Sequence, residues 1–324
     1  MGRAGRAALG LATRPAFLFP GQGSQAVGMG RALAAAHPEA RDALAEADEV
    51  LGMPLARLMF EGPAEELTRT ENAQPALLAH GAAAARVLAA RGVEPGVAAG
   101  HSLGEFTALV ATGALAYPDA LRLVRLRGEL MGRAGDERRG AMSALLGLDD
   151  GAAAAVCAEA STGGEVVVPA NLNAPGQVVI SGDAEAVARA GELARARGAK
   201  RVVPLQVSGA FHSPLVAPAA EGLRAALAET PIGRPRVPVV ANVTAEPSQD
   251  PAALRRLLAE QLTSPVRWAA SMLRMVGMGF ADFVECGPGR VLAGLARRVD
   301  GVRSAVSVGE PADLEVLVSI AAGS

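Results

Sequence analysis

Val97-Ala98-Ala99 is a short apolar stretch that leads into Gly100-His101-Ser102-Leu103-Gly104, and a helical stretch, 105–112, follows directly. The pentapeptide has the pattern G-x-S-x-G, which is typical of a sharp turn between a buried strand and a helix. Glycine on each side of the turn leaves room that a Cβ atom would fill. The stretch therefore predicts an α/β fold in which Ser102 stands at the end of a strand.

The chemistry of such a turn depends on what it exposes. The hydroxyl of Ser102 would stand clear of the backbone, where it could attack a carbonyl carbon. The backbone N–H of Leu103 would then point to the oxyanion that forms. The alternative is a glycine-rich turn that contains a serine by chance. The strand–turn–helix context favours a nucleophile.

A serine hydroxyl needs a base within hydrogen-bond reach to act as a nucleophile near neutral pH. His212 is the best candidate, because it follows a predicted strand in a loop flanked by glycine and proline. His37 and His80 fall in helical patterns and are expected to pack or to face solvent, and His101 is expected to have a structural role in the turn. No acidic residue between Ser102 and His212 occupies an obvious loop position after a strand of the larger sheet. We therefore predict a Ser–His dyad whose imidazole is held by a backbone carbonyl.

Arg127 stands out on the helix predicted for residues 119–134. A helical wheel places the charged residues together on one side: Arg122, Arg125, Glu129 and Arg133. The opposite side is apolar and carries Leu123, Val124, Leu126, Leu130 and Met131. Arg127 falls on this apolar side, where a guanidinium must find an anion or remain an uncompensated charge. A structural ion pair or snorkelling is one interpretation, and a fork that grips a substrate carboxylate is the other.

Strand and helix patterns alternate along the rest of the chain. Strands are predicted at 16–19, 97–99, 141–148, 166–168, 177–181, 201–207, 237–243 and 281–285. Helices are predicted at 31–51, 74–90, 105–112, 119–134 with Asp119 as N-cap, 149–160, 183–197, 218–229, 251–262 and after Gly289. Residues 135–140 are interpreted as a linker and 171–176 as a turn.

The order β-α-β-β-α-β within 141–208 is typical of a ferredoxin-like unit. The fold class predicted is α/β, with an α/β-hydrolase-like large subdomain and an inserted ferredoxin-like small subdomain. The large subdomain is assigned to 16–137 and 207–324, and the small one to 138–206. Residues 1–15 are basic and acid-free without a continuous apolar run, so a disordered leader is expected, with a cleaved targeting peptide as the alternative.

Composition excludes several function classes. A net charge of −2 and only 3% aromatic residues argue against a nucleic-acid partner. No apolar run reaches the length of a membrane span. The two cysteines, Cys157 and Cys286, lie far apart, and neither they nor the four histidines have metal-ligand spacing. We expect a reduced, cytoplasmic protein with no metal and no contact with a membrane.

Several motifs together resemble one family, the malonyl-CoA:acyl-carrier-protein transacylases of type II fatty-acid synthesis, which are related to the acyltransferase domains of polyketide synthases. The resemblance covers nearly the whole chain from Phe17 onward. In chain order the motifs are Phe19-Pro20-Gly21-Gln22-Gly23-Ser24-Gln25, Gly100-His101-Ser102-Leu103-Gly104-Glu105, Arg127-Gly128-Glu129-Leu130-Met131, Gly209-Ala210-Phe211-His212-Ser213-Pro214, and Gln261-Leu262 before Pro265-Val266.

The resemblance implies a ping-pong transfer. Ser102 would be the acylated nucleophile, His212 its base, and Arg127 the group that grips the free malonyl carboxylate. His101 would be a further contact in the cleft.

The resemblance also implies supporting roles. The backbone N–H groups of Gln22 and Leu103 would form the oxyanion hole, and Gln261 would contribute the carbonyl that orients the base. Asn171 and Asn173 match an asparagine-containing turn near the cleft of the family.

The implied substrates are malonyl-CoA and a phosphopantetheinylated acyl carrier protein, with no bound cofactor, and we expect a monomer. Carrier proteins of the family are acidic, so Arg290, Arg297 and Arg298 could steer docking, unless they only form a solvated helical face. Three alternatives remain open: a discrete acyltransferase of a polyketide synthase, a serine esterase or thioesterase, and a non-enzymatic carrier-binding module.

Overall fold

The strands form two separate sheets in the part of the chain that the structure describes. This computed structural model describes residues 14–207 and 209–315. The larger sheet has the strand order β10 (Ser304–Val308), β9 (Asp282–Cys286), β1 (Ala16–Phe19), β2 (Val97–Gly100), β7 (Val239–Val240) and β8 (Pro247–Ser248). Its strands pair in parallel, except that β8 is antiparallel to β7. The smaller sheet is antiparallel, in the order β4 (Val167–Ala174), β5 (Gln177–Asp183), β3 (Gly140–Leu146) and β6 (Arg201–Pro204).

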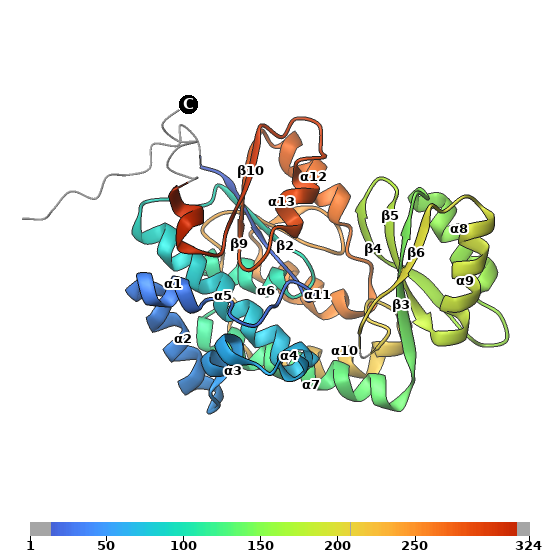
Figure 1. Cartoon of the computed structure of the whole chain (residues 1–324), viewed down its shortest axis with the longest axis horizontal. Helices are drawn as coiled ribbons and strands as arrows, with labels where there is room; N and C mark the ends of the chain where they lie inside the picture. Colours follow the sequence, from blue (N-terminus) through green and yellow to red (C-terminus); the bar gives the residue numbers. More distant parts are fainter. Residues whose placement is uncertain (1–13, 208, 316–324) are drawn as a thin grey trace, which may run out of the picture.

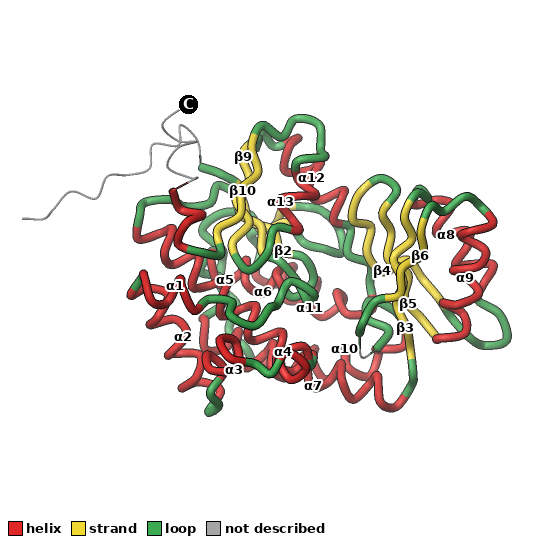
Figure 2. The backbone as a smooth tube through the Cα atoms, in the orientation of Figure 1, coloured by secondary structure: helices red, strands yellow, loops and turns green. Residues whose placement is uncertain are grey.

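Helices connect these strands and cover both faces of the larger sheet (Figures 1 and 2). Before the smaller sheet the helices are α1 (Arg31–Ala36), α2 (Pro38–Leu51), α3 (Leu55–Glu61), α4 (Ala64–Thr68), α5 (Thr70–Ala90), α6 (Gly104–Ala111) and α7 (Tyr117–Glu137). The smaller sheet carries α8 (Asp150–Ala160) and α9 (Ala184–Ala196). After it come α10 (Ala217–Glu229), α11 (Pro251–Glu260), α12 (Trp268–Gly277) and α13 (Val291–Ala296), with short 3₁₀ turns at Pro214–Val216 and Gln261–Thr263.

The alternation of side chains along β1 explains why the larger sheet has a hydrophobic core on each face. Successive side chains of a strand point to opposite faces of the sheet. Phe17 and Phe19 therefore pack into the large core made with α1, α2, α5, α6 and α7. Ala16 and Leu18 pack into a second core on the other face, together with Trp268 of α12. Because both faces are covered, β1 and β2 are buried at every position, as expected of a parallel sheet.

The smaller sheet lies beside the larger one and carries α8 and α9 on its far side (Figure 1). Its own core is built by residues of β3, β4, β5 and these two helices. In sequence order its elements are β-α-β-β-α-β, and β3 lies between β5 and β6. The α/β fold class, with a mainly parallel sheet and a separate antiparallel sheet, is confirmed. The subdomain boundaries stay a prediction, and all but the last two residues of the expected leader, 1–15, lie outside the described residues.

Two predicted loops are wrong. The segment 135–140 is not a linker, because α7 continues to Glu137 and β3 begins at Gly140; Gly135 is buried, so the helix is held by packing. The segment 171–176 is not all turn, because β4 extends to Ala174 and only Pro175 and Gly176 join it to β5. Pairing with β5, with two register shifts, overrides the turn preference of asparagine.

Other boundaries also differ. The helix predicted at 31–51 is two helices, because His37, which precedes Pro38, has an extended backbone. Asp119 lies in the first turn of α7 and is not its N-cap, which is Ala116. The strand predicted at 237–243 shortens to the two residues of β7. No element was predicted at α3, α4, β8, α12 or β10. Among the described residues, no helix is both long enough and apolar enough to cross a membrane.

Candidate active site

Ser102 lies on a tight turn between β2 and α6. Its φ is 51°, in the left-handed region that side chains other than glycine rarely adopt. The turn needs the glycines around it, because a Cβ atom on Gly100 would lie 1.9 Å from the carbonyl of Gly104. A Cβ atom on Gly104 would lie 2.0 Å from the carbonyl oxygen of Phe19 on the neighbouring strand. Close backbone contact thus fixes where the hydroxyl of Ser102 can point.

His212 meets this hydroxyl from a loop far along the chain. The Oγ of Ser102 lies 2.8 Å from Nε2 of His212. Nδ1 of His212 donates to the backbone carbonyl of Gln261 at 2.9 Å and to that of Ser264 at 3.1 Å. Because Nδ1 faces two acceptors, it carries the proton, and Nε2 is left to accept the proton of Ser102. No carboxylate of the described residues contacts His212.

Electrostatics keep the imidazole neutral. Burial lowers the pKa of His212 to about 3, and the positive charge of Arg127 acts in the same direction. The two backbone carbonyls oppose this shift by stabilising the charged ring. A neutral imidazole is the form that can remove a proton from serine.

Arg127 of α7 contacts the same hydroxyl. Its Nη2 donates to Oγ of Ser102 at 2.9 Å and to Oε1 of Gln261 at 3.0 Å. Its Nη1 donates to Oε1 of Gln74 at 2.7 Å, and its Nε has no partner among the described residues. Arg127 is 1% exposed, and the Cζ of its guanidinium lies 5.8 Å from the centre of the Phe106 ring. Every oxygen it touches is neutral.

The charge of Arg127 is therefore only partly compensated. Burial lowers its pKa to about 9, and the negative charge of Glu105 opposes the shift from a distance. Within residues 14–207 and 209–315, no carboxylate forms an ion pair with Arg127, so the structural ion pair considered from the sequence is absent there. A buried cation without an anion in contact is a site that a carboxylate ligand can complete.

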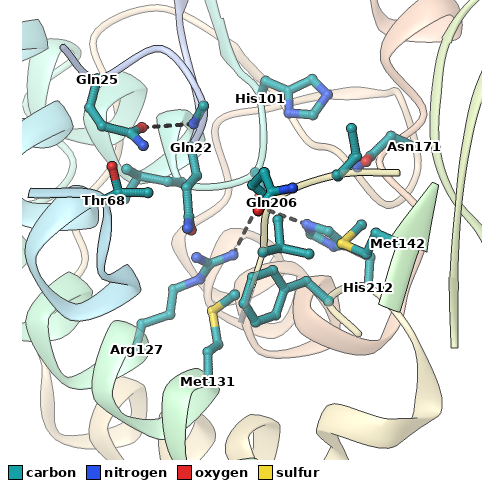
Figure 3. Close-up of a pocket in the computed structure, with 16 residues that line it drawn as sticks. Gln22, Gln25, Thr68, His101, Arg127, Met131, Met142, Asn171, Gln206 and His212 are labelled. Carbon is teal, nitrogen blue, oxygen red and sulfur yellow. Dashed lines mark hydrogen bonds between the residues drawn. The ribbon is translucent and has the colours of Figure 1, made fainter. Parts of the chain in front are cut away.

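A cavity of about 370 Å³ brings these groups together (Figure 3). In Figure 3, Arg127 and His212 reach one oxygen from opposite sides, and dashed lines mark both hydrogen bonds. The segments that form the larger sheet and its helices supply residues on one side of the cavity, among them Gln22, Ser102, Leu103 and Arg127. The segment that forms the smaller sheet supplies Met142, Asn171 and Leu205. The site thus lies between the two sheets.

The two residues of the predicted oxyanion hole line this cavity. Gln22 and Leu103 both line it beside Ser102. Within the described residues, neither backbone N–H has a hydrogen-bond acceptor. Unpaired N–H groups next to a nucleophile are the arrangement that stabilises an oxyanion.

Comparison with known proteins agrees with this site. A family model described as "Acyl transferase domain" matches residues 16–315. A malonyl CoA-acyl carrier protein transacylase of Bacillus subtilis is 47% identical, over 94% of this chain and 96% of its own. The enzyme of that name from Escherichia coli K12 is 45% identical, over 95% of this chain and 100% of its own.

Solved structures of malonyltransferases are also similar to this chain. A crystal structure of an acyl carrier protein S-malonyltransferase from Vibrio cholerae has a TM-score of 0.91 at 46% identity, covering 94% of this chain and all of that one. A malonyl-transacylase in complex with a type II PKS acyl-carrier protein has a TM-score of 0.92 at 44% identity, covering 95% of this chain and all of that one. The chain belongs to the malonyl CoA-acyl carrier protein transacylase family.

Family membership draws attention to the polar residues around the turn. His101 lines the cavity, packs against Trp268 with the two rings tilted by 53°, and donates from Nε2 to Oδ1 of Asn173 at 2.8 Å. Asn171 also lines the cavity, whereas Asn173 reaches it only through His101. Both asparagines lie on β4 and not on the turn expected from the family resemblance.

The remaining candidates lie away from the cavity. His80 is buried in α5 and donates to the carbonyl of Gly309, and His37 contacts Arg91. Arg290, Arg297 and Arg298 are exposed on or beside α13, and their role in docking stays a prediction. In the described part of the chain, no three His, Cys, Asp or Glu side chains gather as metal ligands would.

Three residues of the site were not found from the sequence: Gln74, Glu105 and Asn242. Gln74 accepts from Arg127, and Asn242 holds the backbone of Ser102. Glu105 is buried beside Asn242, and burial raises its pKa to about 7. Glu105 is the last residue of the motif at 100–105, but no local sequence pattern marks Gln74 or Asn242. Only the folded chain brings them to the serine.

Proposed function

We propose that this protein transfers a malonyl group from malonyl-CoA to the phosphopantetheine thiol of acyl carrier protein, through a malonyl ester on Ser102, and so supplies fatty-acid synthesis. One observation carries the choice of acyl group. The buried guanidinium of Arg127 donates to the oxygen of Ser102 itself and contacts no carboxylate of the residues that the structure describes. A free carboxylate at the far end of a short acyl group would complete it.

The first half-reaction uses groups already in contact. Nε2 of His212 takes the proton of Ser102 as Oγ attacks the thioester carbonyl. The oxyanion forms beside the backbone N–H groups of Gln22 and Leu103, each typically worth about 3–4 kcal/mol of barrier. The C–S bond then breaks, CoA leaves with the proton from His212, and the malonyl ester of Ser102 remains.

The second half-reaction runs in reverse. His212 takes the proton of the carrier protein's thiol, whose sulfur attacks the ester carbonyl, and the proton returns to Oγ as the ester bond breaks. Arg127 holds the malonyl carboxylate through both steps, so the reacting carbonyl keeps one position. No metal or cofactor is needed for either step.

The partners and setting follow from the same proposal. The carrier protein is acidic, so exposed arginines such as Arg298 near the smaller sheet would steer it. The free, buried thiols of Cys157 and Cys286 support a reducing compartment, and we propose a cytoplasmic monomer.

A carrier protein of polyketide synthesis is the second candidate acceptor. It is favoured by the likeness to a transacylase solved with a type II PKS acyl-carrier protein. The chemistry is identical, and only the docking partner differs. Transfer rates measured with a fatty-acid and a polyketide carrier protein in parallel would separate the two.

The proposal is tested by intact mass spectrometry after mixing with malonyl-CoA. We expect the wild-type protein to gain one malonyl group and to lose it when phosphopantetheinylated carrier protein is added. Ser102→Ala should gain none, and labelling that persists in this variant would place the nucleophile elsewhere.

The role of Arg127 is tested by comparing two acyl donors. Arg127→Ala should lower kcat/KM for malonyl-CoA by about 10²-fold or more, since a charge-assisted pair is worth about 3 kcal/mol. Acetyl-CoA lacks the carboxylate and should react equally well or better. Equal losses with both donors would make Arg127 a structural residue.

A further inference from the structure

The backbone of Ser102 is held in an unfavourable conformation. Its φ of 51° brings Cβ close to the following carbonyl, and such a residue persists only where its surroundings fix it. Both backbone polar groups of Ser102 are engaged by side chains from distant segments. The N–H is held by Asn242 and the carbonyl by Gln261.

Asn242 bridges the end of β2 and the nucleophile. Its Oδ1 accepts from the N–H of Ser102 at 2.7 Å, and its Nδ2 donates to the carbonyl of Gly100 at 2.7 Å. The side-chain amide of Asn242 thus holds the two peptide units between Gly100 and Ser102, where the chain turns, at both ends. Asn242 is 1% exposed and follows β7, the strand next to β2 in the sheet.

Glu105 anchors this bridge. One carboxylate oxygen, Oε2, accepts from the backbone N–H of Asn242 at 3.1 Å and from Nε2 of Gln261 at 2.8 Å. Nε2 of Gln261 also donates to the carbonyl of Ser102 at 3.0 Å. Both side chains that hold Ser102 therefore depend on one carboxylate, three residues further along the same turn.

We propose that Asn242 is a positioning residue for acyl transfer, which holds Ser102 in its left-handed conformation while Glu105 anchors it. This keeps Oγ aimed at His212 and leaves the N–H of Leu103 turned to the cavity. The inference rests on the proposed function. Because Asn242 acts on the nucleophile and not on the acyl group, it affects every acyl donor alike.

The first test is Asn242→Ala, followed by single-turnover acylation with malonyl-CoA and with acetyl-CoA. Misplacing a nucleophile by about 1 Å costs up to about 10²-fold in rate, so we expect a loss of about 10- to 100-fold with both donors. The ratio of the two rates should stay within about 2-fold of wild type. A change in that ratio, as expected for Arg127→Ala, contradicts the proposal.

A matched control separates positioning from general stability. Asn72 is also buried, donates to the carbonyl of Glu66 at 2.9 Å and accepts from Arg125 at 2.7 Å, outside the cavity. Asn72→Ala removes the same side-chain atoms, and urea unfolding will show whether the losses of stability match. We expect its acylation rate to stay within about 2-fold of wild type.

Asn242→Asp gives a second readout that does not depend on the first variant folding. A protonated carboxyl group reproduces the carboxamide, with an oxygen for the N–H of Ser102 and a hydroxyl for the carbonyl of Gly100. An ionised carboxylate has no proton to donate to the carbonyl of Gly100, and it would lie next to the carboxylate of Glu105. The acylation rate of this variant relative to wild type should therefore rise as the pH falls from about 8 to about 5.5.

The outcomes distinguish a failure of the proposed function from a failure of the positioning role of Asn242. If the wild-type protein forms no acyl-serine, the proposed function fails. If wild type is acylated and Asn242→Ala is acylated at the same rate while folded, the proposed function stands and the positioning role is wrong. A relative rate for Asn242→Asp that does not change with pH also overturns it.

Discussion

At the scale of single residues, the site depends on a hydroxyl shared by a donor and an acceptor. Arg127 donates to Oγ of Ser102, and the hydroxyl's own proton points to Nε2 of His212. Burial and the positive charge of Arg127 both lower the pKa of His212, so the guanidinium acts on the base as well as on the acyl group.

This coupling predicts a shift in the pH profile. Because the pKa of His212 is lowered to about 3, kcat/KM with acetyl-CoA should not fall between about pH 8 and about pH 5. In Arg127→Ala, one cause of the lowered pKa of His212 is gone, so the acidic limb of the pH profile of kcat/KM should move to higher pH. Arg125→Ala, on the same helix but outside the cavity, is the control and should leave the limb unchanged. An unmoved limb in Arg127→Ala would contradict the coupling.

These residues differ in how readily the sequence reveals them. Ser102 is marked by its flanking glycines, and Arg127 by its place on an apolar helix face, since both signals are local. Asn242 is 140 residues from Ser102 in the chain, and its role is to hold backbone atoms. Such a contact leaves no periodicity or spacing in the sequence.

At the scale of elements, α5 and α7 approach closely beside the site. A Cβ atom on Gly128 of α7 would lie 2.6 Å from Cα of Glu71 and 2.7 Å from the carbonyl of Thr70, both in α5. Arg127 is the residue before Gly128, and its partner Gln74 is on α5. The glycine therefore sets the helix separation that brings Arg127 to Gln74.

Two alanine substitutions on α7 test this approach. Gly128→Ala should destabilise the protein by about 1–3 kcal/mol, because backbone must move apart, and should lower kcat/KM for malonyl-CoA. Gly132 lies one turn further on, where a Cβ atom would meet only Oε2 of Glu71 at 3.9 Å. Gly132→Ala should instead stabilise the helix by up to about 1 kcal/mol. Urea unfolding of both variants is the measurement, and equal effects would show that the close approach does not matter.

The errors in the predicted elements have a common cause. Local turn residues pointed to a loop at 171–176 and a linker at 135–140, but tertiary contacts extended β4 and α7 through them. The backbone N–H of Leu172 also donates to the carbonyl of Val266, and that of Val266 donates to the carbonyl of Ala170, so the segment before α12 holds β4 extended. The amphipathic helix α9 and the short apolar strand β1 were predicted well, since their own residue patterns decide them.

At the scale of the whole molecule, the site lies where two sheets meet, and buried histidines couple its stability to pH. His80 joins α5 to the end of β10 through the carbonyl of Gly309, and its Nδ1 has no partner within the described residues. Burial lowers its pKa to about 4, against an unfolded value of 6.5. Between these values the unfolded chain takes up a proton that the folded protein does not. Stability is thus lost as the pH falls.

Replacing His80 should remove this loss. His80→Gln keeps a donor for Gly309 but does not titrate. Between about pH 7.5 and about pH 5, wild type should lose roughly 2 kcal/mol of unfolding free energy more than the variant. Other buried groups, such as Glu105, titrate in both proteins and cancel in the comparison. Parallel urea titrations at the two pH values decide, and equal losses would refute the assignment.

The left-handed backbone at Ser102 also bears on how this position can change over generations. Glycine adopts that conformation freely, so drift under selection for stability alone would replace the serine with glycine. Only the need for the hydroxyl opposes that drift. A paralogue that had lost the reaction would therefore be expected to carry glycine there and to unfold less readily.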